Sequence, residues 1–162
     1  MREIELTQGY VALIDDEDYE LVSGYEWHLH RDRNANYART SVSRNGKRAR
    51  VYMHRLIMDA PKGRQVDHID HDALNNRRAN LRMCTASQNQ GNQRKQTGTS
   101  SQYKGVCWHK EKGKWHAKIK ANAPCRHLGY FSDETDAARA YNDAARELFG
   151  EFAELNVIEA EE

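Results

Sequence analysis

The first 30 residues of the chain alternate between short apolar runs and acidic positions. Val11, Leu13 and Ile14 predict a strand, and the residues after them predict a short helix and a second strand. Asp15 stands where the helix begins, and the three acidic residues that follow it suit the positive end of a helix. A metal-binding cluster is the alternative interpretation of these acids, and we favour the helix start.

Residues 35–53 show the period-two alternation of a β-hairpin around the turn dipeptide Asn45-Gly46. Basic side chains recur on one face of this ribbon, where they suit contacts to phosphates. These basic positions are Arg39, Arg48 and Arg50. An exposed hairpin kept soluble by its charges fits the same pattern, so both interpretations stay open. A short helix is predicted over residues 54–58.

The C-terminal third has the pattern of a small sheet and one helix. Strands are predicted over residues 103–109, 114–121 and 126–131, followed by a helix over 133–149 with Ser132 as its cap. In the middle strand, apolar residues alternate with His116, Lys118 and Lys120, which gives one packed face and one basic face. Gly150 suits the end of the helix. The predicted helix stripe is Ala137, Tyr141, Ala144, Ala145 and Leu148, and the predicted aromatic core is Trp108, Trp115, Tyr130 and Phe131.

These elements predict an α+β chain of two small domains. The polar residues 95–102 are rich in Gly, Gln, Ser and Thr and are the predicted linker. The expected domains are therefore residues 1–94 and 103–157, with an acidic tail over 158–162.

The charge of the chain is strongly segregated although its net value is only +1. Residues 1–30 carry −7 and residues 133–162 carry −8, whereas residues 31–132 carry +16. A basic middle of this size favours a polyanionic partner such as nucleic acid.

Composition excludes several classes of protein. No apolar stretch approaches the roughly 20 residues that span a bilayer, and the N-terminus lacks the apolar core of a signal peptide. The three cysteines, Cys84, Cys107 and Cys125, are far apart and form neither a disulfide framework nor a zinc bracket. We therefore expect a soluble cytoplasmic protein.

The segment over residues 65–90 brings together a carboxylate, an imidazole and an amide. Asp67-His68 follows a short predicted strand, a polar loop and a second strand come next, and Thr85 can cap a helix that carries Asn89. A neutral His can act as the base that activates water. Asp and Asn oxygens suit a hard divalent cation, so this set has the chemistry of phosphodiester hydrolysis. A solvated loop pair is the plainer interpretation of Asp67 and His68.

Residues 51–93, with VYMHRLIM, VDHIDHDALNNRRANLR and SQNQGNQ, resemble the HNH motif of phage and intron homing endonucleases. The resemblance implies a ββα-metal nuclease unit in which His68 is the general base and Asn80 braces the loop. It implies that Asp67 and Asn89 hold one divalent metal, magnesium or alternatively manganese. His71 stands where the motif usually has glycine. His54 could approach this site or pack on its helix.

Residues 103–156, with YKGV, GKWHAKI, HLGYF and the closing AELN, resemble the DNA-binding domain of plant ethylene-response factors. The resemblance implies a three-stranded antiparallel sheet, packed on one helix, that enters the major groove. The expected DNA-binding positions are Lys104, His109, Lys118, Lys120 and Arg126. Cys107, Cys125 and His127 replace the family's arginines and tryptophan, so its target sequence does not carry over.

The sequence therefore predicts a metal-dependent HNH endonuclease of the homing type that acts on double-stranded DNA without an obligate protein partner. One nuclease motif per chain predicts a nick rather than a double-strand break, with 5′-phosphate and 3′-hydroxyl products implied by the resemblance. The expected location is the cytoplasm of a bacterial or phage-infected cell. A non-catalytic DNA-binding regulator and an RNA-binding protein are the alternatives.

Overall fold

The computed structural model of the chain describes residues 1–32, 35–44, 46–121 and 124–158. The chain divides into two compact units, Met1–Thr85 and Ala86–Glu162. This division lies before the predicted linker, so helix α3 (Ala86–Asn92) counts with the second unit. The domain boundaries over 1–94 and 103–157 stay a prediction. No helix among the described residues is long and apolar enough to cross a membrane.

The N-terminal segment of the first unit has the predicted strand, short helix and second strand, preceded by one strand that the sequence did not predict. Strand β1 (Arg2–Glu5) pairs antiparallel with β2 (Val11–Ile14), with the 3₁₀ turn η1 (Thr7–Gly9) between them. The 3₁₀ turn η2 (Asp16–Asp18) and helix α1 (Tyr19–Val22) follow. Ile14 at the end of β2 is completely buried. It anchors this segment in the core.

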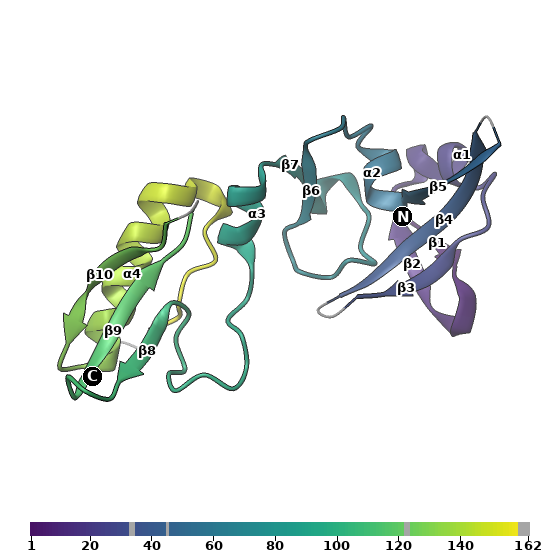
Figure 1. Cartoon of the computed structure of the whole chain (residues 1–162). Coiled ribbons are helices and arrows are strands. Elements are labelled where there is room, and N and C mark those ends of the chain that lie inside the picture. Colours follow the sequence, from purple (N-terminus) through teal and green to yellow (C-terminus); the bar gives the residue numbers. More distant parts are fainter. Residues whose placement is uncertain (33–34, 45, 122–123, 159–162) are drawn as a thin grey trace. The chain divides into compact units, whose positions relative to one another are not determined.

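The predicted hairpin forms the larger sheet of this unit (Figure 1). Strands β3 (His28–Arg31), β4 (Asn36–Arg44) and β5 (Lys47–Tyr52) are antiparallel in the order β3-β4-β5. Gly46 has a positive φ of 74°, as the turn requires, whereas Asn45 lies outside the described residues. The predicted short helix is α2 (Met53–Ile57), and its Met53 side chain is completely buried.

A second, smaller ladder follows in the first unit. Strands β6 (Gln65–His68) and β7 (Leu81–Cys84) pair antiparallel. The connection between them holds the 3₁₀ turn η3 (Arg78–Asn80). Asp67 and His68 therefore stand at the end of β6, where the polar connection begins.

The second unit contains the predicted sheet packed on one helix (Figure 1). Strands β8 (Val106–His109), β9 (Lys114–Ile119) and β10 (Arg126–Phe131) are antiparallel in the order β10-β9-β8. Helix α4 (Glu134–Phe149) contacts all three strands, and the 3₁₀ turn η4 (Gly150–Phe152) follows it. The alternation in β9 is confirmed, because Ala117 and Ile119 are buried against the helix side.

Four details of this unit differ from the prediction. The helix cap is Asp133 and not Ser132, because the Asp133 carboxylate accepts hydrogen bonds from the backbone of Thr135 and Asp136. In the helix stripe, Leu148 is exposed and its neighbour Phe149 is buried instead. Trp108 is 41% exposed in the edge strand β8, where it packs edge-on against Trp115. Tyr130 is not core, because its ring stacks on His116. Gly150 is confirmed as the C-terminal cap with φ of 54°.

Candidate active site and nucleic-acid interface

Asp67 is held in place by an arginine on the neighbouring strand. Asp67 and Arg82 face each other in the β6-β7 ladder. Nε of Arg82 donates to Oδ2 of Asp67 at 2.9 Å, and Nη2 lies at the same distance. The aspartate side chain is 6% exposed and the arginine 16%. This charge-assisted pair gives the buried carboxylate a cationic partner and fixes its orientation.

His68 directly follows Asp67 in β6, and its ring packs against other aromatic rings. Its Nε2 lies 3.4 Å from Oδ1 of the fully buried Asn76. The His54 ring stands edge-on at 5.0 Å between centroids, and the Tyr37 ring lies at 6.3 Å. Burial lowers the pKa of His68 below its usual range, although the Asn76 contact and nearby carboxylates oppose that shift. The imidazole is therefore neutral at physiological pH and can accept a proton.

The connection between β6 and β7 is held by side-chain hydrogen bonds around Asn80. The Asn80 amide donates to Oδ1 of Asp70 at 2.8 Å and to the carbonyl of Asn75 at 2.8 Å. Its own oxygen accepts the backbone N–H of Asp70 at 3.0 Å. The second carboxylate oxygen of Asp70 accepts from the Asn75 amide at 2.6 Å. Asn80 stands near the end of the connection and is thus bonded to Asp70 near its start and Asn75 in its middle. Its contribution to catalysis stays a prediction.

His71 occupies the position where the HNH motif usually has glycine. Its φ is 66°, in the left-handed region that favours glycine. The backbone of His71 donates to the carbonyl of His68 at 3.1 Å, which closes a turn. The turn that the motif requires is therefore made despite the histidine.

The acidic N-terminal residues bind this connection. The Asp15 carboxylate accepts the backbone N–H of Arg78 at 2.8 Å. The Arg78 guanidinium contacts Asp18, which is 2% exposed, at 2.7 Å and Glu17 at 3.0 Å. No side chain caps η2 at Asp15. The helix-cap role predicted for Asp15 is therefore wrong, because its carboxylate bonds the nuclease segment 63 residues later in the chain.

Strand β2 holds the same connection through its backbone. The N–H of Leu13 donates to the carbonyl of Leu74 at 2.8 Å, and the carbonyl of Leu13 accepts from Asn76 at 2.7 Å. Asn76 is the residue whose side chain faces His68. Strand β2 thus sets the position of Asn76, which contacts the candidate base His68.

The basic face of the hairpin continues toward His68. In β4 and β5, Ser41 faces Arg50 and Ser43 faces Arg48, and Arg39 faces Tyr52. Tyr37 lies on this same face of β4, two residues before Arg39. The Tyr37 ring contacts Tyr52 at 5.7 Å and His54 at 5.6 Å. The face of β4 that carries Arg39 therefore also carries Tyr37, whose ring lies 6.3 Å from that of the predicted base His68.

The two predicted metal ligands belong to different units of the chain. Asp67 belongs to the first unit, whereas Asn89 lies in α3 of the second. Among the described residues, no three His, Cys, Asp or Glu side chains form a metal-binding group. A site that combines Asp67 with Asn89 stays a prediction. The Asp67 carboxylate fits a hard divalent cation in its chemistry, because its oxygens are ligands of the kind that such cations prefer and Arg82 holds it in one orientation.

The face of the second sheet that points away from α4 carries a histidine cluster. Nε2 of His116 lies 2.7 Å from Nδ1 of His127, and Nδ1 of His116 lies 4.0 Å from the Cys107 sulfur. The His109 ring contacts Tyr130 at 5.2 Å. Burial, and then the charge of His127, lowers the pKa of His116. This face is the one that the ethylene-response-factor resemblance assigns to DNA.

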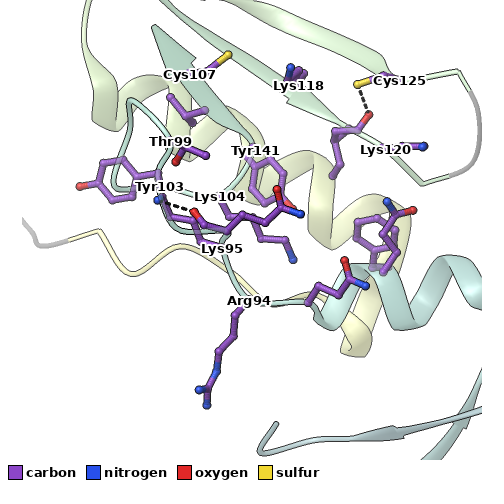
Figure 2. A pocket seen from close by; sticks show the side chains of 17 residues that line it. Arg94, Lys95, Thr99, Tyr103, Lys104, Cys107, Lys118, Lys120, Cys125 and Tyr141 are labelled. Carbon is purple, nitrogen blue, oxygen red and sulfur yellow. Dashed lines mark hydrogen bonds between the residues drawn. The ribbon is translucent and has the colours of Figure 1, made fainter. Parts of the chain in front are cut away.

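The remaining predicted DNA-binding positions of this unit fall into two groups. Arg126 forms an exposed ion pair with Glu147 at 3.4 Å. Lys104, Lys118 and Lys120 line a cavity at one end of the sheet (Figure 2). The five positions predicted from the sequence are therefore not one continuous patch.

Comparison with known proteins identifies the family of the chain. A sequence profile described as HNH endonuclease matches residues 51–90, which contain Asp67, His68, Asn80 and Asn89. The chain is 34% identical over 154 residues to "Uncharacterized HNH endonuclease L560" of Acanthamoeba polyphaga mimivirus, covering 94% of this chain and 78% of the relative. The chain belongs to the HNH endonucleases.

A second viral relative matches part of this HNH endonuclease. "Protein 3.8" of Escherichia phage T7 is 32% identical over 93 residues, covering 57% of this chain and 76% of the relative. No solved structure matches the chain. The profile ends at residue 90, and neither relative's name refers to a plant-type domain. The resemblance of residues 103–156 to ethylene-response factors therefore stays a proposal.

The sequence proposed Asp67 and His68 as site residues but did not point to the residues that hold them. Arg82 could have been found from the register of the two strands, since it directly faces Asp67. Asn76 lies only eight residues after His68, but its contact depends on the path of the irregular connection. Tyr37 carries no such signal, because it comes from a strand that is distant in the sequence. His54, which the sequence left between two interpretations, lies against His68.

Proposed function

We propose that this HNH endonuclease is a metal-dependent enzyme of the homing type that nicks double-stranded DNA at a recognised site. The observation that carries the proposal is the pairing at the end of β6 of a buried neutral His68 with the fixed carboxylate of Asp67. A polar connection held by Asn80 begins directly after them. The two relatives are viral, so we place its action in an infected host cell.

His68 would act as the general base. Its lowered pKa leaves the ring ready to take a proton from the attacking water, which makes hydroxide available at the phosphorus. Asn76 at Nε2 and the ring of His54 restrict the rotation of the imidazole. The base is thus oriented before the substrate binds.

Asp67 and Asn89 would hold one divalent metal, which we take to be magnesium with manganese as a substitute. When bound, the metal would stabilise negative charge that develops on the phosphate. Arg82 occupies one side of the Asp67 carboxylate and orients it. Asn80 would act by keeping the connection after His68 in place.

Two surfaces would bind the DNA. The first is the face of β4 and β5 with Arg39, Arg48 and Arg50, which leads along Tyr37 to His68. The second unit would act as an ethylene-response-factor-like domain that adds contacts through Lys104, His109, Lys118, Lys120 and Arg126. Positively charged groups on both units fit the phosphate backbone.

A nicking assay tests the proposal. Supercoiled plasmids carrying fragments of the host's or phage's own DNA would be incubated with the protein and magnesium. We expect open circles with the wild-type protein and none with His68→Ala or with a chelator. The control is Glu20→Ala, which changes an exposed residue of α1 and should nick normally. Nicking at the wild-type rate by His68→Ala would refute the role of His68.

The competing function is a DNA-binding regulator with an inactive nuclease unit. It is favoured only by the histidine and lysine positions of the second unit, which need no catalysis. Specific DNA binding without any metal-dependent cut, by a protein shown to be folded, would support this alternative.

A further inference from the structure

A basic cavity lies within the second unit, at the end of its sheet (Figure 2). The cavity measures about 460 Å³, which is within the range of sites that hold small molecules. Its walls are the end of α3 with the segment after it, the start of β8, the end of β9 and the buried side of α4. All of these elements belong to the same unit.

The side chains around this cavity carry positive charge. The basic lining residues are Arg94, Lys95, Lys104, Lys118 and Lys120. Among the described residues that line it, none is acidic. Gln90, Gln93 and Thr99 add neutral hydrogen-bonding groups, and Tyr141 and Phe149 form an apolar floor. A cavity with this lining favours an anion that also has an uncharged part.

Lys104 is the most enclosed of these cations. Its Nζ donates to the carbonyl of Gly91 at 2.6 Å and lies 5.9 Å from the centre of the Tyr141 ring. Burial lowers the pKa of its amine to about 8, although the charge of Glu154 opposes that shift. An anion in the cavity would favour the charged form of this amine.

The backbone under Lys104 is fixed. The N–H of Lys104 donates to Oδ1 of Asn156 at 2.6 Å, and the carbonyl of Lys104 accepts from the same amide at 3.1 Å. The next residue, Gly105, has φ of 77° and no room for a side chain, because a Cβ there would lie 2.0 Å from the Tyr141 ring. The ammonium group of Lys104 is therefore presented from a rigid base.

Lys118 and Lys120 contribute from the neighbouring strand. Both are exposed; Lys118 lies in β9 next to the buried Ile119, and Lys120 directly follows the end of that strand. The N–H of Lys118 donates to the carbonyl of Gly105 at 2.9 Å, which ties the two lysine-bearing segments together. The cations thus come from three separate segments of chain, which is typical of a formed binding site and not of a run of charges.

We propose that this cavity, lined by Lys95, Lys104, Lys118 and Lys120, binds a phosphodiester group of the DNA strand together with its neighbouring sugar. The inference rests on the proposed DNA-binding function and refines it. Three of the predicted DNA contacts would act inside the cavity, whereas His109 and Arg126 lie outside it. The segment after α3 would then take part in binding directly, through Lys95 and its neighbours.

Two pairs of variants of the full chain separate cavity binding from general charge. Lys118→Gln with Lys120→Gln removes two cations from the cavity. Lys112→Gln with Lys114→Gln removes two cations near the other end of β9, outside the cavity. We measure the affinity for a labelled random-sequence duplex over a range of salt concentrations. The first pair should lose about tenfold in affinity and reduce the salt slope by about two, and the second should change less.

A second comparison fills the cavity without changing its charge. Gln96 lines the cavity and Thr97, the next residue, does not. Gln96→Trp should weaken duplex binding severalfold, whereas Thr97→Trp should leave it unchanged. Equal affinities for these two variants would overturn the proposal, and so would equal effects of the two lysine pairs.

Competition by pyrophosphate tests whether the cavity binds a phosphate of DNA or a free phosphate compound. We expect it to compete with the duplex at high concentration for the wild-type protein and to compete less for Gln96→Trp. Tight binding of pyrophosphate, together with normal duplex binding by the cavity variants, would assign the cavity to a free phosphate compound instead. These assays measure binding only. A protein that binds through the cavity but does not nick would therefore contradict the proposed function and leave this inference standing.

Discussion

The guanidinium of Arg82 lies 2.9 Å from the buried carboxylate of Asp67, directly across the β6-β7 ladder. The pair stabilises an ionised group that would otherwise be unfavourable in the interior. It also places a permanent positive charge beside the carboxylate that we propose as a metal ligand. Stability and metal affinity are therefore linked at this one position.

Replacing the arginine should make both effects visible. We expect Arg82→Gln to lower the free energy of unfolding by about 3 kcal/mol, because it leaves Asp67 buried without its partner. Magnesium should then raise the Tm of the variant by more than it raises that of the wild-type protein, since the cation replaces the lost charge. The control is Arg126→Gln, which breaks an exposed pair and should cost less than about 1 kcal/mol. Equal responses to magnesium would argue against Asp67 as a ligand.

The buried His54 should make the first unit sensitive to acid. It is 8% exposed, and among the described residues its Nδ1 has no hydrogen-bond partner. Burial, then the charges of His68 and Arg55, lowers its pKa to about 3. The unfolded chain takes up a proton near pH 6.5 and the folded chain does not, so stability is lost as the pH falls through that value.

Chemical denaturation at two pH values measures this loss. Between pH 7.5 and pH 5 we expect His54 to account for about 2 kcal/mol of the decrease in unfolding free energy. His54→Gln removes the titrating group, so its stability should fall by that much less over the same interval. An identical fall in the wild type and the variant would show that His54 is not responsible.

Substituting glycine at position 71 should stabilise the protein. His71 has φ of 66°, and glycine adopts this conformation without the clash of a Cβ. We expect His71→Gly to raise the unfolding free energy by roughly 0.5 to 1 kcal/mol and to leave nicking intact. His28→Gly, within the extended strand β3, should instead lower it. A loss of stability on His71→Gly would mean that the side chain makes contacts that outweigh the backbone strain.

DNA binding by the second unit should strengthen as the pH falls. Burial and the charge of His127 lower the pKa of His116, so its ring is neutral at pH 7.5. Lys112, Lys118 and His109 add further positive charge near it. A bound phosphate favours the protonated ring, and protonation as the pH falls below 6.5 therefore adds attraction.

Fluorescence anisotropy at constant salt concentration would measure this dependence. We expect the affinity of the wild-type protein for duplex DNA to rise severalfold from pH 7.5 to 5.5. His116→Gln with His127→Gln should respond less, and Glu20→Gln, which changes an exposed residue of α1, should behave like the wild type. The same pH response in all three proteins would place the titrating group elsewhere.

Local patterns were enough to predict most of the regular elements and to propose the centre of the candidate site. The hairpin around Gly46, the alternation in β9 and the Asp67-His68 pair are visible in the sequence because each depends on neighbouring residues. The exposure of Trp108 was not predictable, because it depends on how far the helix extends over the sheet edge. The partner of Asp15 was not predictable either, since Arg78 lies 63 residues away. Most of the features that the sequence did not predict depend on interactions between segments that are distant in the chain.

The bonds from Leu13, Asp15 and Asp18 to the nuclease connection have an evolutionary consequence. The matched profile begins at residue 51, yet the connection within it is held by the first 18 residues. A gene fragment that encodes only the profile region would therefore lack the residues that hold its connection in place. Recombination that moves this nuclease between proteins should carry the N-terminal segment with it, and divergence in one segment should be followed by compensating changes in the other.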